Sequence, residues 1–548
     1  MSTVVENIIN SFLGIQRFPK ESNIVYKIPL AKLPKRQYKR TDNETMVDVV
    51  NFKHEEMKQV VSEFINHHKE NQVPRLEALK RYYNTQNDIK QRAAKTDEYR
   101  ADNRIASDFA KFQVTFKRGV VIGNPLAYSG PDKVVELVQE FNTRIDEDSH
   151  NQMMFKDMLI FGRGYELIHY DAHGKECISK LDPIQTFIIY DTTLLGKSIA
   201  GVRYYDVEYL GKKTTNVEIY SSEGFTYHFV TDSGDLLNAE LLEGFPKTSP
   251  FQAVQVNEWR NDEEMTGDYE NALDIIDAYD LSQSELANFQ QDSSDAYLVV
   301  SGNPFSNGED EKSDKELLRE MRKARMLILG ESEVYPDGTR GAESKAYYLK
   351  KEYDTSGVEA YKDRLVADFL RFTCLIDFTD DNMGGSQTGI GLRFKGWGSD
   401  NDRKNKERQV KKAIRRRMRI LSDSWSVKER LNEKGLNKII NAFKKGIASD
   451  KTSLYNQINE IEIKFTPNIP QSDKETMEVI KGMYGVVSDE TIYNMATRLT
   501  GVKAEEEIKR VLKEEQEKMK DAVTDMMFPE RKSKEGLALP SSGGSDKK

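Results

Sequence analysis

The chain has 548 residues, enough for three to four domains of roughly 150 residues each, and it is 38% hydrophobic and 31% charged with a mean hydropathy of −0.68. Because this balance is poorer in apolar residues than a typical globular protein, we expect long amphipathic helices or small domains completed by partner chains instead of one large core. The net charge of −9 argues against a protein that coats DNA. No apolar run reaches the length of a membrane-spanning helix, which is about 18 residues. Two cysteines are too few for a disulfide framework or a Cys-rich zinc module.

The first part of the chain is predicted to be an arm followed by helices. Residues 1–45 are rich in Lys, Pro and Asn and carry no secretory signal pattern, so we interpret them as an arm in a protein of a reducing compartment. From about residue 45 to residue 65, apolar residues recur at helical spacing, and a second helix follows Pro74. Residues 100–130 predict a third helix that ends between Gly119 and Gly123.

Residues 155–260 change to the pattern of β-strands. Segments such as GVRYYDVEYL and TNVEIYSSEGFTYHFV alternate with period two, and turn pairs such as His173-Gly174 and Asp182-Pro183 separate the runs. We expect a small, mostly antiparallel β region.

Two long helices are predicted on either side of a small unit. Residues 267–292 and 355–375 carry apolar residues near helical spacing. Between them, the runs AYLVVSG and SKAYYLKKEY are typical of strands and bracket a helix at residues 314–329. Cys374 is expected in the apolar core of the second long helix, which stops at the Gly-rich loop IDFTDDNMGGSQTGIGLRFKGWGSD.

The C-terminal part is predicted to be helical with one closing strand. A basic helix starts near residue 401 and extends past Trp425, and the strand IEIKFTPNIP follows it. Three short helices (472–484, 488–499 and 502–520) precede a Ser/Gly/Lys tail from residue 528 that is expected to be disordered. The predicted fold class is therefore α+β and mainly α, with several domains.

Charge is strongly segregated along this chain. Residues 402–419 contain ten basic and two acidic side chains, whereas residues 262–295 are acidic and contain no Lys or Arg. The ten cations spread around every face of a helix, so they require acidic neighbours, from the same chain or the next subunit, or phosphates. The sequence leaves these alternatives open. An acidic helix repels the phosphates of DNA, so it is suited to a surface along which DNA moves without binding tightly.

The motifs of catalysis and cofactor binding are missing from the sequence. It has no GxxxxGK[ST] phosphate loop and no GxSxG nucleophile motif, and GIGLRFKGWG lacks the strand–helix frame of a dinucleotide site. His54, His67 and His68 do not have metal-ligand spacing, and the pair Asp380-Asp381 has no ligand partner near it in sequence. We therefore expect no catalysis, no metal and no cofactor.

The order of these parts resembles the portal proteins of tailed bacteriophages, of the family typified by phage SPP1, over roughly residues 45–525. Four stretches carry the resemblance, and the third and fourth are the most specific. They are NRIASDFAKFQVTFKRGVVIGNPLAY, FGRGYELIHYDAHGKECISKLDPIQTFIIYD, GDYENALDIIDAYDLSQSELANFQQDSSDAYLVVSG and IDFTDDNMGGSQTGIGLRFKGWGSDNDRKNKE.

The resemblance implies a virion protein that forms a ring, normally of twelve and possibly of thirteen subunits when isolated, around a channel for double-stranded DNA at one capsid vertex. It implies the following division of the chain: arm 1–45, first part of the wing 46–266, stem helices 267–292 and 354–375, clip 293–353, tunnel loop and flanks 376–400, second part of the wing 401–470, crown 471–525 and tail 526–548. The implied partners are the terminase large subunit, a head-completion (adaptor) protein, and the major capsid and scaffolding proteins. Assembly in the bacterial cytoplasm is implied, and no membrane is involved.

The resemblance and the charge pattern together single out three sets of candidate residues, and the sequence leaves open whether the basic helix receives phosphates or supports neighbouring subunits. The tunnel-loop candidates are Asp380, Asn382, Met383, Gly384, Gly385, Ser386, Gln387, Thr388, Gly389 and Ile390. The acidic-wall candidates on the stem are Asp268, Glu270, Asp274, Asp277, Asp280 and Glu285. The basic-helix candidates are Arg403, Lys404, Lys406, Arg408, Lys411, Lys412, Arg415 and Arg416. A Gly-rich, weakly charged loop can contact the backbone of moving DNA without reading its base sequence.

Two other classes of protein stay open from the sequence alone. A nucleic-acid-processing enzyme subunit would use the basic helix, but it requires a carboxylate–metal cluster or a phosphate loop. A minor head or scaffolding protein would form no closed ring.

Overall fold

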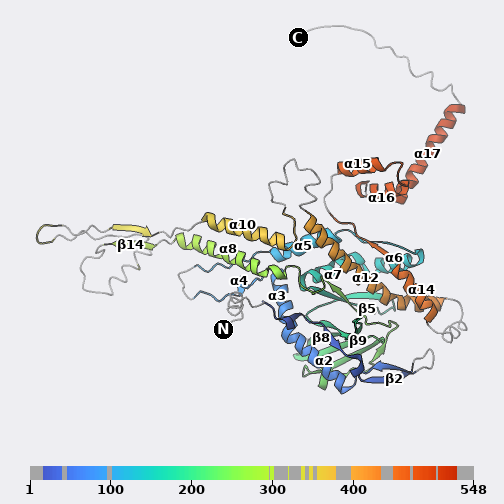
Figure 1. The fold of residues 1–548 in the computed structure, drawn as a ribbon, viewed down its shortest axis with the longest axis horizontal. Helices are drawn as coiled ribbons and strands as arrows, with labels where there is room; N and C mark the ends of the chain where they lie inside the picture. Colours follow the sequence, from blue (N-terminus) through green and yellow to red (C-terminus); the bar gives the residue numbers. More distant parts are fainter. Residues whose placement is uncertain are drawn as a thin grey trace, which may run out of the picture. The chain divides into compact units, whose positions relative to one another are not determined.

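The computed structural model describes residues 17–39, 46–95, 101–294, 297–301, 319, 335–339, 345–349, 355–377, 396–432, 448–468, 473–500 and 504–527. The chain forms two compact units, residues 1–468 and 469–548 (Figure 1). The described part is α+β and mainly helical with small, mostly antiparallel sheets, which confirms the predicted fold class.

A seven-stranded sheet forms one layer of the first unit. Its strands are β1 (Tyr26–Ile28), β7 (Thr186–Asp191), β8 (Ser198–Tyr209), β9 (Lys212–Ser221), β10 (Phe225–Thr231), β11 (Glu240–Leu241) and β12 (Lys247–Thr248). The order is β1-β7-β8-β9-β10-β11, with β12 also on β10, and only the β1–β7 pair is parallel among these pairs. Leu210 and Gly211 join β8 to β9 with φ values of 51° and 74°, as a two-residue hairpin turn requires.

Helix α2 (Glu55–His67) covers one face of this sheet. Met57, Val61 and Ile65 recur on one side of the helix and share a buried core with strand residues such as Val202 and Ile219. The 3₁₀ helix η4 (Leu236–Asn238) packs against α2, and a π-helical turn, η3 (His68–Gln72), joins α2 to α3 (Val73–Tyr83).

Two expectations for the N-terminal part were wrong. The described residues 17–39 are not a separate arm, because β1 pairs with β7 and Tyr26 is buried in the core of the sheet. The helix expected from residue 45 begins at Glu55, because residues 46–50 form β3 (Met46–Val50), which pairs with β2 (Lys35–Lys39). Short 3₁₀ turns, η1 (Lys20–Asn23) and η2 (Leu30–Lys32), complete this region.

His68 is a buried histidine that makes folding sensitive to pH. Its Nδ1 lies 2.7 Å from the Tyr204 hydroxyl, its ring packs on Phe187, and only 1% of the residue is exposed. Burial, reinforced by the nearby Arg163 charge, lowers the pKa of His68 to about 3. The folded state therefore resists a proton that the unfolded state binds below about pH 6.5.

Acidification is accordingly predicted to destabilise the first unit through His68. Between pH 7.5 and pH 5, this side chain alone lowers the free energy of unfolding by about 2 kcal/mol. Denaturant titrations of the wild type and His68→Gln at both pH values measure the difference, with His54→Gln, an exposed histidine, as the control. An identical pH dependence in the wild type and His68→Gln would contradict the prediction.

A second layer packs helices around a three-stranded sheet. The sheet has the order β13-β5-β6, from β13 (Val256–Arg260), β5 (Arg163–Tyr170) and β6 (Glu176–Leu181). The helices of this part are α4 (Asp88–Gln91), α5 (Phe109–Ile122), α6 (Asp132–Ile145), α7 (Glu147–Phe161), α12 (Trp397–Asn432) and α14 (Ala448–Asn459). A two-stranded sheet joins β4 (Ala127–Ser129) to the predicted closing strand, β16 (Glu462–Lys464).

Helix α7 ends at Gly162, which has a φ of 80° and leads directly into β5. A Cβ on this residue would lie 2.0 Å from the Met265 carbonyl oxygen, so another side chain is sterically excluded there. This close approach places the start of β5 against the segment that leads into the next long helix.

Two long helices lie side by side in Figure 1. They are α8 (Leu273–Ser294), which follows η5 (Glu270–Ala272), and α10 (Thr355–Phe372). Between them, β14 (Tyr297–Ser301) and β15 (Lys345–Leu349) form an antiparallel pair within the chain, so both predicted strands are confirmed. The helix expected at 314–329 lies outside the described residues. Cys374 follows the end of α10 and is partly exposed, so its expected place in the helix core was wrong.

The second unit contains three consecutive helices, α15 (Asp473–Met483), α16 (Asp489–Thr500) and α17 (Ala504–Met527). Contacts join α15 to α16 and α16 to α17. The three predicted helices are therefore present, with α17 longer than expected, and the tail from residue 528 lies outside the described residues.

Candidate functional site: the base of the helix pair and the basic helix

Asp268 lies at the base of the helix pair in a buried cluster of charges. Its carboxylate accepts hydrogen bonds from Lys117 of α5, at 2.8 Å, and from Lys406 of α12. The three side chains are 4%, 8% and 6% exposed, respectively. Burial alone would raise the pKa of Asp268, but the two lysine charges hold this pKa well below its usual range. Asp402 lies 2.8 Å from Lys117 and completes a neutral set of two lysines and two carboxylates.

The next two acidic candidates are also paired inside the chain. Glu270 binds the buried Arg75 through two hydrogen bonds of 2.7 and 2.5 Å. Asp277 accepts from Arg17 at 2.7 Å and from the Tyr82 hydroxyl at 2.5 Å. These bonds fix the start of α8 to α3 and to the segment that precedes η1.

Asp280 is fully buried, and no cation among the described residues lies within hydrogen-bonding distance of it. It accepts from the Asn87 side chain at 2.6 Å and from the Ser107 backbone N–H at 2.7 Å. Burial raises the pKa of Asp280 to about 6. Its role in the described structure is to hold the segments around residues 87 and 107 against α8.

The expected acidic wall is therefore wrong for three of its six residues, because the side chains of Asp268, Glu270 and Asp280 are buried by groups of their own chain. Asp277 is 30% exposed and is paired with Arg17. Asp274 and Glu285 keep exposed side chains, 75% and 42% respectively. Arg17 lies 3.2 Å from Asp274 and Arg92 lies 3.3 Å from Glu285. Exposed pairs of this kind contribute little to stability and leave the carboxylates accessible.

The cations of α12 fall into two groups. Arg403, Lys404, Lys406 and Arg417 each have a carboxylate partner in the chain. Among residues 397–426 of α12, no carboxylate that the structure describes pairs with the other cations, which are Arg408, Lys411, Lys412, Arg415, Arg416 and Arg419. Some of these make neutral contacts: Arg416 donates to Ser198 at 3.0 Å and Lys411 lies over the Phe465 ring.

Arg417 is the centre of a buried polar network that the sequence did not single out. Its guanidinium donates to both carboxylate oxygens of Glu166, at 2.9 and 2.7 Å, and to Asn151 at 2.9 Å. Glu147 lies 3.4 Å away, and the guanidinium stacks over the Trp259 ring at 5.4 Å. Burial alone would raise the pKa of Glu166, but the Arg417 charge holds this pKa well below its usual range. The network joins α12 to α7, β5 and β13.

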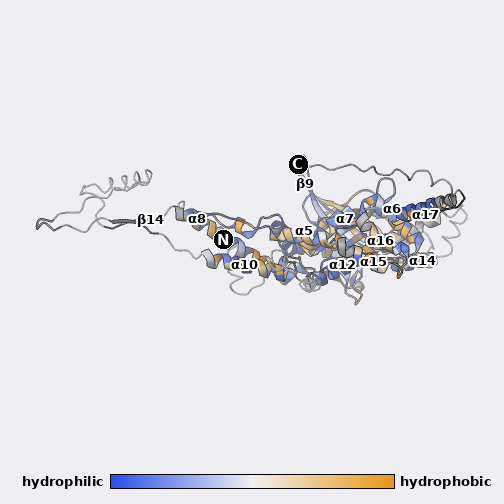
Figure 2. Cartoon of the chain, turned by 90° about the horizontal axis from the view of Figure 1, so that it is seen from above, coloured by the Kyte–Doolittle hydropathy of each residue, from blue (hydrophilic) through white to orange (hydrophobic). Residues whose placement is uncertain are grey.

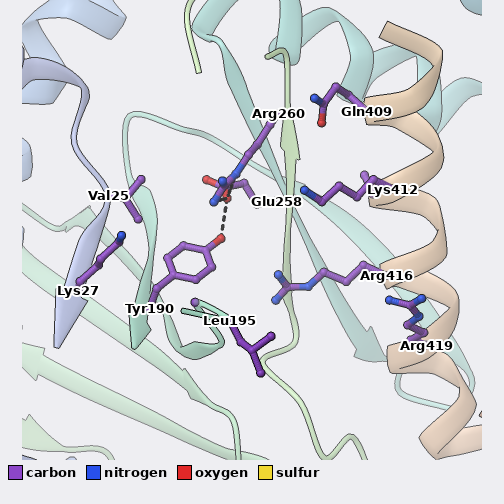
Figure 3. A pocket seen from close by; sticks show the side chains of 12 residues that line it. Val25, Lys27, Tyr190, Leu195, Glu258, Arg260, Gln409, Lys412, Arg416 and Arg419 are labelled. Atoms are coloured by element: carbon purple, nitrogen blue, oxygen red, sulfur yellow. Dashed lines mark hydrogen bonds and ion pairs between the residues drawn. The ribbon is translucent and has the colours of Figure 1, made fainter. Parts of the chain in front are cut away.

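A basic pocket of about 410 Å³ is lined by residues of α12, β13, β1 and β7 (Figure 3). Lys412 and Arg416 point into it from α12, and Arg260 faces them from β13. The carboxylate in the pocket, Glu258, is bound to Arg260 and to the Tyr190 hydroxyl at 2.6 Å each. A second basic pocket of about 320 Å³ is lined by Arg408, Lys411, Lys412, Arg415 and Arg419.

The tunnel-loop candidates, all between residues 380 and 390, lie outside the described residues. The described part of the chain holds no group of three or more His, Cys, Asp and Glu side chains arranged for a metal ion. Among the described helices, none has the length and apolar character needed to cross a membrane.

A family model described as "Phage portal protein, SPP1 Gp6-like" matches residues 62–521. Because this match covers most of the chain, the protein belongs to that family of phage portal proteins, which is structural rather than enzymatic.

A particular relative is the portal protein of Bacillus phage SPP1, to which the chain is 21% identical over 354 residues. The alignment covers 61% of this chain and 66% of that relative, slightly less than two thirds of its length. Among solved structures, the chain is similar to a chain in the virion of a native gene transfer agent (GTA) particle, with 11% sequence identity and a TM-score of 0.34. That match covers 72% of this chain and 90% of the GTA chain. For the neck of the native GTA particle computed with C12 symmetry, the identity is 10%, the TM-score 0.35, and the coverage 71% and 89%. TM-scores this low carry no structural argument.

Proposed function

We propose that this chain is one subunit of a ring, normally of twelve copies, whose central channel conducts double-stranded DNA into and out of a phage head at one capsid vertex. The observation that carries the proposal is the family match, which extends from α2 to α17 and so includes both long helices and the segment between α10 and α12. The large and polar surface of a chain that is only 38% hydrophobic is consistent with faces that meet neighbouring copies, shell and DNA.

The parts of the chain are assigned within this proposal. The helix pair α8–α10 is the stem, residues 293–353 form the clip, the two sheets with α12 belong to the wing, and α15–α17 form the crown. The clip binds the terminase large subunit and later the adaptor protein, and other faces contact the major capsid and scaffolding proteins. The wing includes residues 17–39, which pack into its sheet. The proposal assigns the chain no catalysis and no cofactor, and its assembly takes place in the bacterial cytoplasm.

DNA packaging in a phage that lacks this chain tests the proposal. Without the chain, heads are expected to contain no protected genome, and a copy supplied in trans restores packaging. Nuclease-protected DNA per head is the measurement. Normal packaging without the chain, or nuclease or ATPase activity of the purified chain, would contradict the proposal.

The segment between α10 and α12 is proposed to be the tunnel loop that contacts DNA. Deleting residues 384–389 is predicted to leave folding and ring assembly intact but to reduce packaged or retained DNA by about tenfold or more, because backbone and small polar side chains there contact the moving duplex. Nuclease-protected DNA per head is compared between the wild type and the deletion, with a head that carries Glu208→Ala, at an exposed position of β8, as the control. Normal heads from the deletion would count against this assignment.

A further inference from the structure

Four of the cations on α12 without a carboxylate partner form a row along one side of the helix. Arg408, Lys412, Arg415 and Arg419 follow each other at intervals of four, three and four residues, which places them on one helix face. We call these four residues the basic row. At 1.5 Å per residue the row is about 16 Å long.

The basic row is accessible and incompletely bonded. Arg408, Lys412 and Arg419 are exposed, and all four residues line the 320 Å³ pocket. The Nε of Arg415 is buried without a hydrogen-bond partner within the part of the chain that the structure describes. Four like charges on one helix face repel each other, so a surface of opposite charge would stabilise this arrangement.

Helix α6 carries a matching row of opposite charge. Asp132, Glu136 and Glu140 are exposed and follow each other every four residues, whereas Val134 and Val138 bury the other face of the helix. We call these three carboxylates the acidic row, which is about 12 Å long. In the described residues, neither Asp132 nor Glu136 has an ion pair, and Glu140 lies 3.5 Å from Arg144.

Within one copy, no ion pair among the described residues joins the two rows. Helices α6 and α12 lie in the same body (Figure 2), where both contact α14 and the rings of Phe141 and Trp425 meet at 6.3 Å between centroids. Helix α12 also contacts β13 and α5, whereas α6 also contacts α7, β4 and β6. A ring of identical subunits requires complementary patches on two different faces, so that each copy presents one patch to each neighbour.

We propose that the basic row on α12 of one copy binds the acidic row on α6 of the next copy in the ring. This inference rests on the ring assembly of the proposed function. On α6, Lys133 lies next to Asp132 in sequence and Arg144 pairs with Glu140, so the acidic row keeps a small excess of negative charge. Helix α17 is a second acidic helix, with eight acidic and five basic residues. If α17 bound the basic row instead of α6, the α6 variant described below would still assemble.

Two charge-reversed chains test this interface by mixing. One chain carries Glu136→Lys and Glu140→Lys, and the other carries Arg408→Glu and Lys412→Glu. Each chain alone places like charges in every interface, so its ring fraction is expected to fall by about tenfold or more. An equimolar mixture restores opposite charges in every interface when the two chains alternate, so rings reappear with an even number of subunits and a 1:1 composition. Mass photometry and native mass spectrometry measure ring fraction and composition.

Matched controls separate the interface from general effects of charge. Glu208→Lys with Glu243→Lys makes the same charge change at exposed positions and is expected to keep the wild-type ring fraction. Circular dichroism and thermal unfolding show that each variant is folded. Full ring assembly by either charge-reversed chain alone would overturn the proposed interface. This includes the case in which the α12 variant forms rings and loses only its binding to DNA. A mixture that forms no rings would overturn the interface as well. A wild type that forms no rings would overturn the proposed function and the interface together.

Discussion

Arg417→Met is expected to lower the free energy of unfolding by about 3–5 kcal/mol, because it leaves Glu166 and Glu147 buried without their cation. Glu166 is 0% exposed and loses both hydrogen bonds from the guanidinium, and Asn151 loses its donor. The methionine fills much of the volume of the arginine, so most of the loss comes from the unpaired charge. Denaturant titration of the full chain measures it.

Two further variants keep this prediction testable if Arg417→Met folds poorly. Arg417→Lys keeps the positive charge but loses the bidentate geometry, so a smaller loss is expected. The double variant Arg417→Met/Glu166→Leu removes charge from both sides and should recover part of the stability. The exposed Lys404→Ala is the control and should change stability by less than about 0.5 kcal/mol. An unfolding free energy for Arg417→Met equal to that of this control would contradict a structural role for the network.

Asp268→Asn is expected to cost about 3–5 kcal/mol of folding stability, because the buried lysines Lys117 and Lys406 then lose their shared counter-ion. The amide has nearly the same shape as the carboxylate, so the change removes one charge and little volume. Since Asp268 precedes η5 and α8, the loss should loosen the base of the stem against α5 and α12. Hydrogen exchange of these three segments reports the loosening, and denaturant titration reports the energy.

Asp274→Asn is the matched control for Asp268→Asn, because it makes the same chemical change at a carboxylate that is 75% exposed. Its expected effect is within about 0.5 kcal/mol of the wild type. Equal effects at the two positions would show that Asp268 does not hold the cluster together.

The periodicity of apolar residues in the sequence predicted several of the helices and strands correctly. Helices α10 and α12 and the short helices of the second unit follow from apolar residues at helical spacing. Strands β8 to β10 follow from alternation of residue types in the sequence, and in β10 buried and half-buried residues alternate as well. The error at β3 has a local cause as well. Val47 and Val50 match a helical repeat that truly begins at Met57, while their pairing partners in β2 are selected by tertiary contacts.

The candidate site depends on partners that are distant in sequence. Lys406 meets Asp268 across 138 positions, and Arg417 meets Glu166 across 251. The charge count of residues 402–419 indicated that the helix requires acidic neighbours, but no local pattern distinguishes the buried Arg417 from its half-buried neighbour Arg416. The same limit explains why Asp277 and Asp280 of α8 were expected on an open wall. Their partners, Arg17 and Asn87, are fixed by the packing of the N-terminal segments.

Electron microscopy of the purified full-length chain tests the central claim most directly. The account predicts closed rings of about twelve subunits, or about thirteen for the isolated protein, each with a central opening wide enough for duplex DNA. Monomers, open filaments or rings without an opening would contradict it.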